Sequence, residues 1–297
     1  MKFDVDVLCV GHASYDLVFS IDHHPGPDEK SLASQFFSSG GGPAANAAVG
    51  VARLGYTAAF AGYLGDDLYG QKHFQELQAN GVIADFVVKG PAPTPLSAIL
   101  VKPDGKRTVV NYRGQTAPLP ETKIDFSLCV PKVILFDGHE PHISLPLSAD
   151  AERQGVLTVL DAGSVHDGTR ALAGRVTFMV ASEKFARDFT GEKDILQAAI
   201  ELSQVAPAVI VTCGEAGLVW RRGSSVGRLG AYRIDAVDTT GAGDAFHGAF
   251  AAGLAAGREW EDLLRYASAA AALCCTQYGA RPALPTAQEV AQFLKYH

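Results

Sequence analysis

The chain has 297 residues, of which 47% are hydrophobic and 19% are charged, and its formal net charge is −7. This composition predicts a globular protein with a sizeable core, and the acidic balance argues against nucleic-acid binding through a basic surface. The five cysteines show no CxxC spacing, which favours free thiols in the cytoplasm, and no apolar run approaches the ~20 residues that a membrane helix needs.

The N-terminal part alternates between short apolar runs and stretches of small residues. We predict strands over residues 5–10, 17–21 and 57–64, an extended piece over 31–37, and helices over 44–54 and 70–80. Pro103-Asp104-Gly105 then separates the apolar runs 98–102 and 107–112, which is typical of a β-hairpin.

The C-terminal part places helical stretches between most of its apolar runs, which lie at 133–137, 157–161, 176–180 and 209–212. Such alternation predicts a mainly parallel sheet covered by helices on both faces, in one domain over residues 1–297. Segments 15–38 and 95–115 do not follow this alternation. We expect them to form a small β-sheet beside the main one.

The sequence DTTGAGDAFHGAF, residues 238–250, carries the strongest chemical signal. Gly241-Ala242-Gly243 directs backbone N–H groups toward a common point ahead of a helix predicted over 244–254, which makes an anion site without a cationic side chain. Plain helix capping is the alternative for these glycines alone. Asp244 would repel a phosphate, but it suits a base that takes a proton from a hydroxyl attacking a phosphoryl group. The GxGxxG and GxxxxGK[ST] fingerprints are absent, which disfavours a dehydrogenase and a P-loop enzyme.

The same stretch resembles the C-terminal signature of the ribokinase-like (PfkB) carbohydrate kinases. SSGGGPAANAAVGVARLG, residues 38–55, resembles the N-terminal signature of that family, and GYLGDDLYG, TCGEAG and YGARPALPT are smaller matches. The resemblance covers nearly the whole chain. It implies a three-layer α/β/α sandwich with a mainly parallel central sheet and a small β-sheet lid.

The resemblance also implies roles for single residues. Asp244 matches the catalytic base, and the N–H groups of Gly241, Ala242 and Gly243 match the anion hole. Four further positions match residues that hold the sugar hydroxyls: Asp16, Gly41, Gly42 and Asn46.

Three nucleotide and metal assignments come from the resemblance as well. The ATP positions are Thr212, Gly214, Gly217 and Gly279. The site of a monovalent cation, usually K⁺, is matched by Asp238 and Thr240, with carbonyl groups around Cys274, Gly279 and Ala283. The NxxE motif that arranges water around Mg²⁺ is replaced, which leaves Glu183 as a substitute acting through water.

The nearest branch by resemblance is that of the sulfofructose and fructose kinases. Lys30 and Asn111 align with residues that hold a sulfonate in that branch, whereas His139 stands where an arginine is expected. A sulfonated sugar, a neutral ketose and a phosphorylated sugar all stay open. A metal site at His139 and His142 is disfavoured, because HEPH lacks the HExxH spacing and we expect Pro141 to break a helix there.

The sequence therefore predicts an ATP·Mg-dependent sugar kinase that phosphorylates a primary hydroxyl of a ketose or a related sugar. The alternatives are a ribokinase or a nucleoside kinase of the same fold, and a noncatalytic sugar sensor. We expect the lid to exclude water from the sugar site and to pair two copies into a homodimer. No nucleic-acid or membrane partner is expected.

Overall fold

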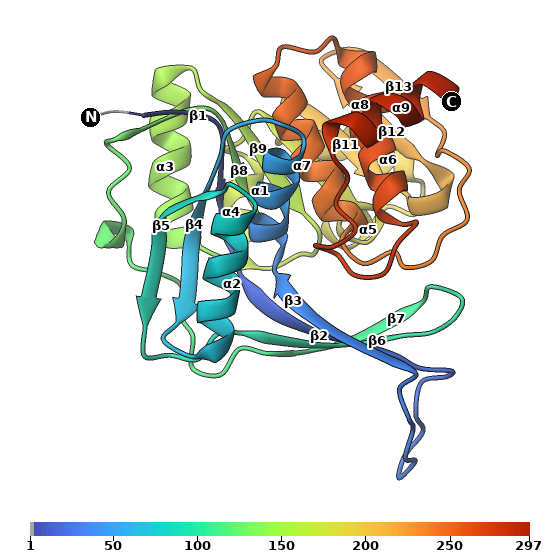
Figure 1. Ribbon diagram of the computed structural model, residues 1–297. Coiled ribbons are helices and arrows are strands. Elements are labelled where there is room, and N and C mark those ends of the chain that lie inside the picture. The colour runs from blue at the N-terminus through green and yellow to red at the C-terminus, as the bar shows by residue number, and fades with distance from the viewer. Residues whose placement is uncertain (1–2) are drawn as a thin grey trace.

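The computed structural model describes residues 3–297, and a nine-stranded sheet forms its centre (Figure 1). The strand order is β13-β12-β11-β10-β9-β8-β1-β4-β5. The strands are β1 (Phe3–Val10), β4 (Ala58–Gly65), β5 (Ile83–Gly90), β8 (Cys129–Phe136), β9 (Leu157–Ala162), β10 (Phe178–Ser182), β11 (Ala208–Thr212), β12 (Leu218–Arg222) and β13 (Ser225–Leu229). All neighbours from β11 to β5 pair in parallel, and β12 and β13 add an antiparallel edge.

Helices cover both faces of this sheet. They are α1 (Pro43–Arg53), α2 (Leu68–Ala79), α3 (Pro141–Gln154), α4 (Asp167–Ala173), α5 (Glu183–Thr190), α6 (Ile195–Leu202), α7 (Ala242–Ala255), α8 (Trp260–Cys274) and α9 (Ala287–Tyr296). The pleat of β1 divides the core: Val7 and Cys9 pack in the cluster with α1, α7 and α8, whereas Leu8 packs in the cluster with α3 to α6. The predicted three-layer α/β/α sandwich is confirmed.

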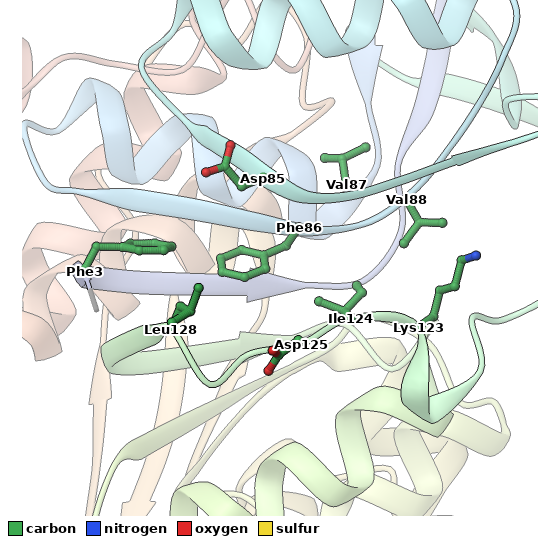
Figure 2. Close-up of a pocket in the computed structure, with 9 residues that line it drawn as sticks. All are labelled: Phe3, Asp85, Phe86, Val87, Val88, Lys123, Ile124, Asp125 and Leu128. Atoms are coloured by element: carbon green, nitrogen blue, oxygen red, sulfur yellow. The ribbon is translucent and has the colours of Figure 1, made fainter. Parts of the chain in front are cut away.

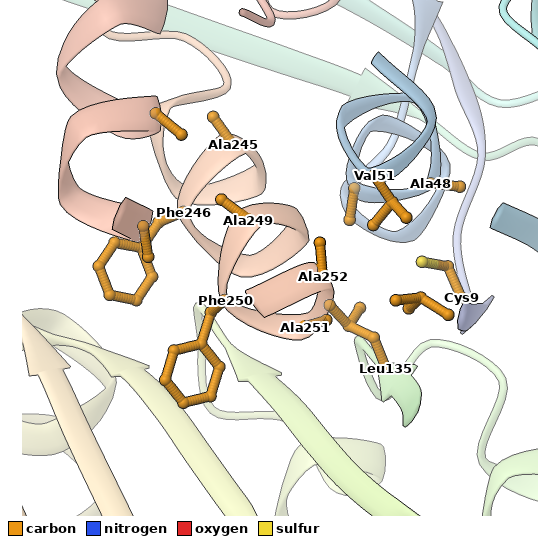
Figure 3. Packing of buried hydrophobic residues seen from close by; sticks show 14 of the residues in the cluster. Cys9, Ala48, Val51, Leu135, Ala245, Phe246, Ala249, Phe250, Ala251 and Ala252 are labelled. Carbon is orange, nitrogen blue, oxygen red and sulfur yellow. The ribbon is translucent and has the colours of Figure 1, made fainter. Parts of the chain in front are cut away.

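Helices α1 and α7 pack unusually closely because their contact is built from small residues. A Cβ at Gly248 would lie only 2.8 Å from the carbonyl oxygen of Ala47. Figure 3 shows Ala252 on the side of α7 that faces Val51 of α1. The close approach brings the first turns of the two helices, and the polar side chains on them, into contact.

A second sheet, which we call the lid, lies beside the main body with strand order β3-β2-β6-β7 (Figure 1). Its strands are β2 (Ser14–Ser20), β3 (Gln35–Gly41), β6 (Leu96–Val101) and β7 (Arg107–Tyr112). The register aligns Ser39, Asp16, Ser97 and Asn111 across the four strands. Residues aligned in this way point to one face of a sheet, so Asn111 shares the face of Asp16.

Three local expectations differ from the structure. β5 and the β12–β13 hairpin lie in segments where no strand was predicted. Pro141 does not break a helix but starts α3, because proline is tolerated in a first turn, where its missing N–H has no partner to lose.

Across residues 3–297, no helix combines the length and the apolar character needed to cross a bilayer.

Candidate active site

The centre of the site is a hydrogen bond between the first turns of α1 and α7. Asn46, which is 2% exposed, donates from Nδ2 to Asp244 Oδ2 at 2.7 Å. Burial of its carboxyl and the nearby charge of Asp161 raise the pKa of Asp244 to about 7, while the hydrogen bond from Asn46 lowers it. A carboxylate with this pKa is well matched to accept a proton near neutral pH.

His247 fixes the start of α7 over the sheet. Its Nδ1 lies 2.6 Å from the carbonyl oxygen of Gly243, and its Nε2 lies 3.2 Å from that of Val180 in the middle of β10. Asp161, at the end of β9, approaches the same Nδ1 at 3.4 Å. Burial raises the pKa of Asp161, and His247 opposes that rise.

The loop before α7 presents backbone N–H groups with no side-chain cap. Gly241 stands at the N-cap with φ 80°, and a Cβ there would lie 2.6 Å from Cβ of Ala280, so this position requires glycine. Ala242 donates to Thr239, whereas the N–H groups of Gly243 and Asp244 find no acceptor among residues 3–297. Free N–H groups at a helix N-terminus attract an anion.

The lid and the start of α1 form the wall opposite this loop. Asp16 is 6% exposed, and its Oδ1 accepts a hydrogen bond from Ser14 Oγ at 2.9 Å. A Cβ at Gly41 would lie 2.1 Å from the Asp16 carboxylate, which shows how closely the two strands approach there. Gly42 leads directly into α1 and therefore toward Asn46. The structure thus brings four of the predicted sugar residues to one wall.

Arg281 is a buried cation that the sequence did not reveal as part of the site. It is 2% exposed and donates from Nε to Asn46 Oδ1 at 3.2 Å, while its Nη1 lies 3.4 Å from Glu76 Oε2. Burial lowers the pKa of Arg281 to about 10, which leaves it charged at neutral pH. Its contact with Asn46 orients the amide that donates to Asp244.

A second group of residues gathers around Asp137, just beyond the end of β8. Asp137 Oδ2 accepts from the backbone N–H groups of His12 at 2.7 Å and Ala44 at 3.2 Å, and Oδ1 accepts from that of His139 at 2.9 Å. His139 packs between His12 and His166. We call these three residues the histidine cluster. His12 and His166 each follow shortly after a predicted strand, which is the signal that could have indicated them.

The structure does not bring Lys30 to this group. Lys30 is exposed in the loop over residues 21–34, which projects away from the body below β2 and β3 (Figure 1). Arg113, directly after β7, approaches the cluster instead, with Nη2 3.4 Å from His139 Nδ1.

The predicted ATP residues follow β11. Thr212 ends this strand and pairs with Ser182, the N-cap of α5. Gly214 and Gly217 shape the turn that follows, in which the N–H of Cys213 donates to the Gly217 carbonyl oxygen at 2.7 Å. The turn therefore lies beside the start of α5, where Glu183 forms an ion pair with Arg187 at 2.7 Å.

Asp238 connects the two loops assigned to the monovalent cation. Its Oδ1 accepts from the N–H and the hydroxyl of Thr240, and its Oδ2 accepts from Gly279 N–H at 2.9 Å. Cys274 Sγ lies 3.7 Å from the Thr240 carbonyl oxygen, and Ala283 donates to that of Gly279 at 3.4 Å. These five residues are brought together, and cation binding there stays a prediction.

A separate hollow lies at the opposite end of β1. Figure 2 shows its apolar lining by Phe3, Phe86, Ile124 and Leu128. Because β1 is parallel to its neighbours, this end carries the amino ends of β1, β4 and β8 and none of the residues described above.

Comparisons with known proteins agree over almost the whole chain. Residues 4–287 match the family model described as pfkB family carbohydrate kinase. The ribokinase of Bacillus subtilis (strain 168) is 29% identical over 293 residues, which cover 97% of this chain and 99% of that relative. Fructokinase-2 of Solanum habrochaites is 30% identical over 318 residues, which cover 93% of each chain.

Solved structures show the same fold. A putative ribokinase from Agrobacterium tumefaciens has a TM-score of 0.90 at 30% identity, and the match covers 99% of both chains. The ribokinase of Arabidopsis thaliana, complexed with ribose and ATP, has a TM-score of 0.87 at 26% identity over 99% of this chain and 100% of that one. The ribokinase-like architecture is thereby established for this chain.

Proposed function

Because the chain belongs to the PfkB family of carbohydrate kinases, we propose that it phosphorylates a primary hydroxyl of a ketose, with Asp244 as the base. An ATP-dependent sugar kinase is the activity that the family membership gives. The proposal concerns the sugar, for which sulfofructose, fructose and a fructose phosphate are the candidates, and the residues that act on it.

The observation that carries the proposal is the hydrogen bond from Asn46 to Asp244. It stabilises the ionised carboxylate, and the pKa of about 7 leaves that carboxylate able to take up the hydroxyl proton at neutral pH. As the proton leaves, the sugar oxygen attacks the γ-phosphoryl group of ATP. Asp16 and Asn46 orient the sugar by accepting from and donating to its hydroxyls.

Charge that develops on the transferring phosphoryl group is stabilised by the loop before α7. The N–H groups of Gly243 and Asp244 have no protein acceptor within residues 3–297, so they are free to donate to phosphoryl oxygens. Such donors act strongly where the lid keeps water out, because the local dielectric constant is low.

Mg²⁺ is expected to enter with ATP. Across the described residues, no three or more His, Cys, Asp or Glu side chains gather into a metal site, and Glu183 is held by Arg187. Mg²⁺ bound to nucleotide phosphates keeps several waters, one of which Glu183 would contact. The protein residues alone therefore do not fit a resident Mg²⁺ site.

The test is ADP release by Asp244→Asn over a panel of fructose, fructose phosphates, sulfofructose, ribose and adenosine. Removal of a general base typically lowers kcat by about 10²- to 10⁴-fold, while calorimetry should show ATP binding unchanged. Asp262→Asn, which alters an exposed carboxylate on α8, is the matched control. Near-normal turnover by Asp244→Asn would refute the assignment, and preferred turnover of ribose or adenosine would replace the ketose.

A further inference from the structure

A buried histidine near the start of α7 has an acceptor at each of its ring nitrogens. His247 Nδ1 lies 2.6 Å from the carbonyl oxygen of Gly243 and 3.4 Å from Asp161 Oδ2. Its Nε2 lies 3.2 Å from the carbonyl oxygen of Val180. We infer that His247 is an imidazolium, paired with Asp161, and that it positions and strengthens the Asp244 N–H as a donor to the transferring phosphoryl group; this inference rests on the proposed function.

The acceptors around the ring require a hydrogen on both nitrogens. A neutral imidazole carries one ring hydrogen, so its other nitrogen would turn a lone pair toward a carbonyl oxygen. The imidazolium donates on both sides. Its charge is balanced inside the protein, because the side chains of His247 and Asp161 are only 6% and 8% exposed. A buried charge is stable where such a partner accompanies it.

Asp161 has His247 as its ionic partner. No other cationic side chain lies within ion-pair distance of Asp161 over residues 3–297. Burial raises the pKa of Asp161, and among the charges that act on this carboxyl His247 has the largest effect, which lowers the pKa. The carboxylates that act on the ring are therefore Asp161 from β9 and Asp244 from α7 itself.

The contact with Gly243 reaches the anion site through one peptide unit. The Gly243 carbonyl group and the Asp244 N–H belong to the same planar trans peptide, so they point in opposite directions. A cation held at the carbonyl oxygen polarises this unit and makes its N–H a stronger donor. The Asp244 N–H has no acceptor among the described residues, so this donor is available to a phosphoryl oxygen.

The contact with Val180 fixes the same peptide to the central sheet. Val180 lies in β10, which is paired with strands on both sides. A donor that is held in place before the reaction needs no reorganisation when charge develops on the phosphoryl group. Burial raises the pKa of Asp244, and the charge of His247 lowers it, which favours the ionised form that accepts the proton. His247 thus acts as a positioning residue for both functions of Asp244.

The first experiment measures kcat and KM of two His247 variants with the sugar that wild type turns over fastest. His247→Phe removes both donors and should lower kcat by about 10- to 100-fold while KM for ATP and sugar changes little, because the lost interaction strengthens only as charge develops. His247→Asn keeps a neutral donor near Nδ1 and should lose only about 3- to 10-fold. Wild-type kcat in both variants would overturn the inference.

Two control variants separate this effect from a general loss of stability. Phe250→Leu loosens the core beneath the same helix, so it should lower Tm and keep kcat. His297→Asn alters an exposed histidine at the end of α9 and should change neither. A loss of kcat in Phe250→Leu equal to that in His247→Phe would overturn the inference, since it would show that any loosening of α7 suffices.

A double-variant cycle tests the pairing with Asp161. Because Asp161 acts through His247, Asp161→Asn alone should also lower kcat. Added to His247→Phe, it should cost no more than His247→Phe alone. Losses that multiply in the double variant would overturn the pairing.

Nuclear magnetic resonance with ¹⁵N-labelled histidine tests the charge of the ring without any sugar. At pH 7 both ring nitrogens of His247 should carry a hydrogen, with the signals assigned by their absence from His247→Asn. One bare nitrogen would overturn the inference. Two protonated nitrogens and a lower kcat in His247→Phe, together with near-normal turnover by Asp244→Asn, would refute the proposed base and leave the role of His247 intact.

Discussion

Replacing Asn46 with alanine should raise the pKa of Asp244 and shift the catalytic pH profile. The 2.7 Å hydrogen bond from Asn46 Nδ2 favours the ionised carboxylate. A hydrogen bond to a charged group contributes about 1.5–3 kcal/mol, which corresponds to roughly one to two pKa units. Because the pKa in the wild type is about 7, the variant should titrate about one to two units higher. The ionised fraction at pH 7 then falls from about one half to roughly 1–10%, and kcat falls by about 5- to 50-fold.

The assay is kcat at saturating sugar and ATP between pH 6 and pH 10, since under the proposed function Asn46 also orients the sugar and its loss should raise KM. The deficit should shrink as the pH rises and the carboxyl group of the variant ionises. Asn80→Ala, at the C-cap of α2, is the control because it removes an amide away from the site. An equal loss of kcat at every pH would refute the argument, since it would show that Asn46 acts without changing the protonation of Asp244.

Three further predictions concern stability, cations and assembly. Asp244→Asn should raise Tm at pH 8 and leave it unchanged at pH 4. The pKa of Asp244 is about 7 in the folded state, above its ordinary value of 3.8. The wild type therefore loses folding free energy as the pH rises from about 4 to about 7, by at most about 4 kcal/mol, and the asparagine variant does not. A lower Tm for the variant at pH 8 would contradict this. We expect kcat to rise when K⁺ replaces Na⁺ at constant ionic strength, and equal rates would remove K⁺ from the site around Asp238. One face of the lid bears three exposed apolar side chains: Phe36, Val110 and Tyr112 are 58%, 61% and 56% exposed. We expect this face to pair two copies of the chain, so sedimentation should give a dimer that Val110→Glu dissociates. A monomeric wild type would contradict this prediction.

The main sheet was predictable because its buried parallel strands are short apolar runs separated by helices. The edge strands were harder: β12 ends in Arg221-Arg222 ahead of Gly223, and its pairing with β11 depends on a chain reversal rather than on periodicity. Asp244 was indicated by its own loop, since the glycines and the acid are adjacent. By contrast, the residues that surround Asp244 come from distant parts of the chain and are brought to it only by the tertiary fold.

Arg281 illustrates that limit. Its burial depends on Glu76 and Asn46, which are 205 and 235 residues away along the chain, and no local pattern reports such contacts. Lys30 illustrates the reverse, because alignment suggested a substrate contact and the structure places it on an outlying loop. The histidine cluster falls between these cases: each member follows a strand, but only the strand order brings β1, β8 and β9 side by side.

Strand β7 of the lid makes a side-chain contact with the main body at each of its ends. Arg107, its first residue, donates to Thr239 Oγ1 at 2.7 Å, two residues before Gly241, and Arg113 follows its last residue at the histidine cluster. Six extended residues span about 20 Å, the scale of a sugar and a phosphate chain laid end to end. Both contacts are present in this structure, so β7 holds the loop before α7 and the histidine cluster at a fixed separation. A substitution in the lid that displaces β7 should therefore disturb the surroundings of Gly241 and of His139 together.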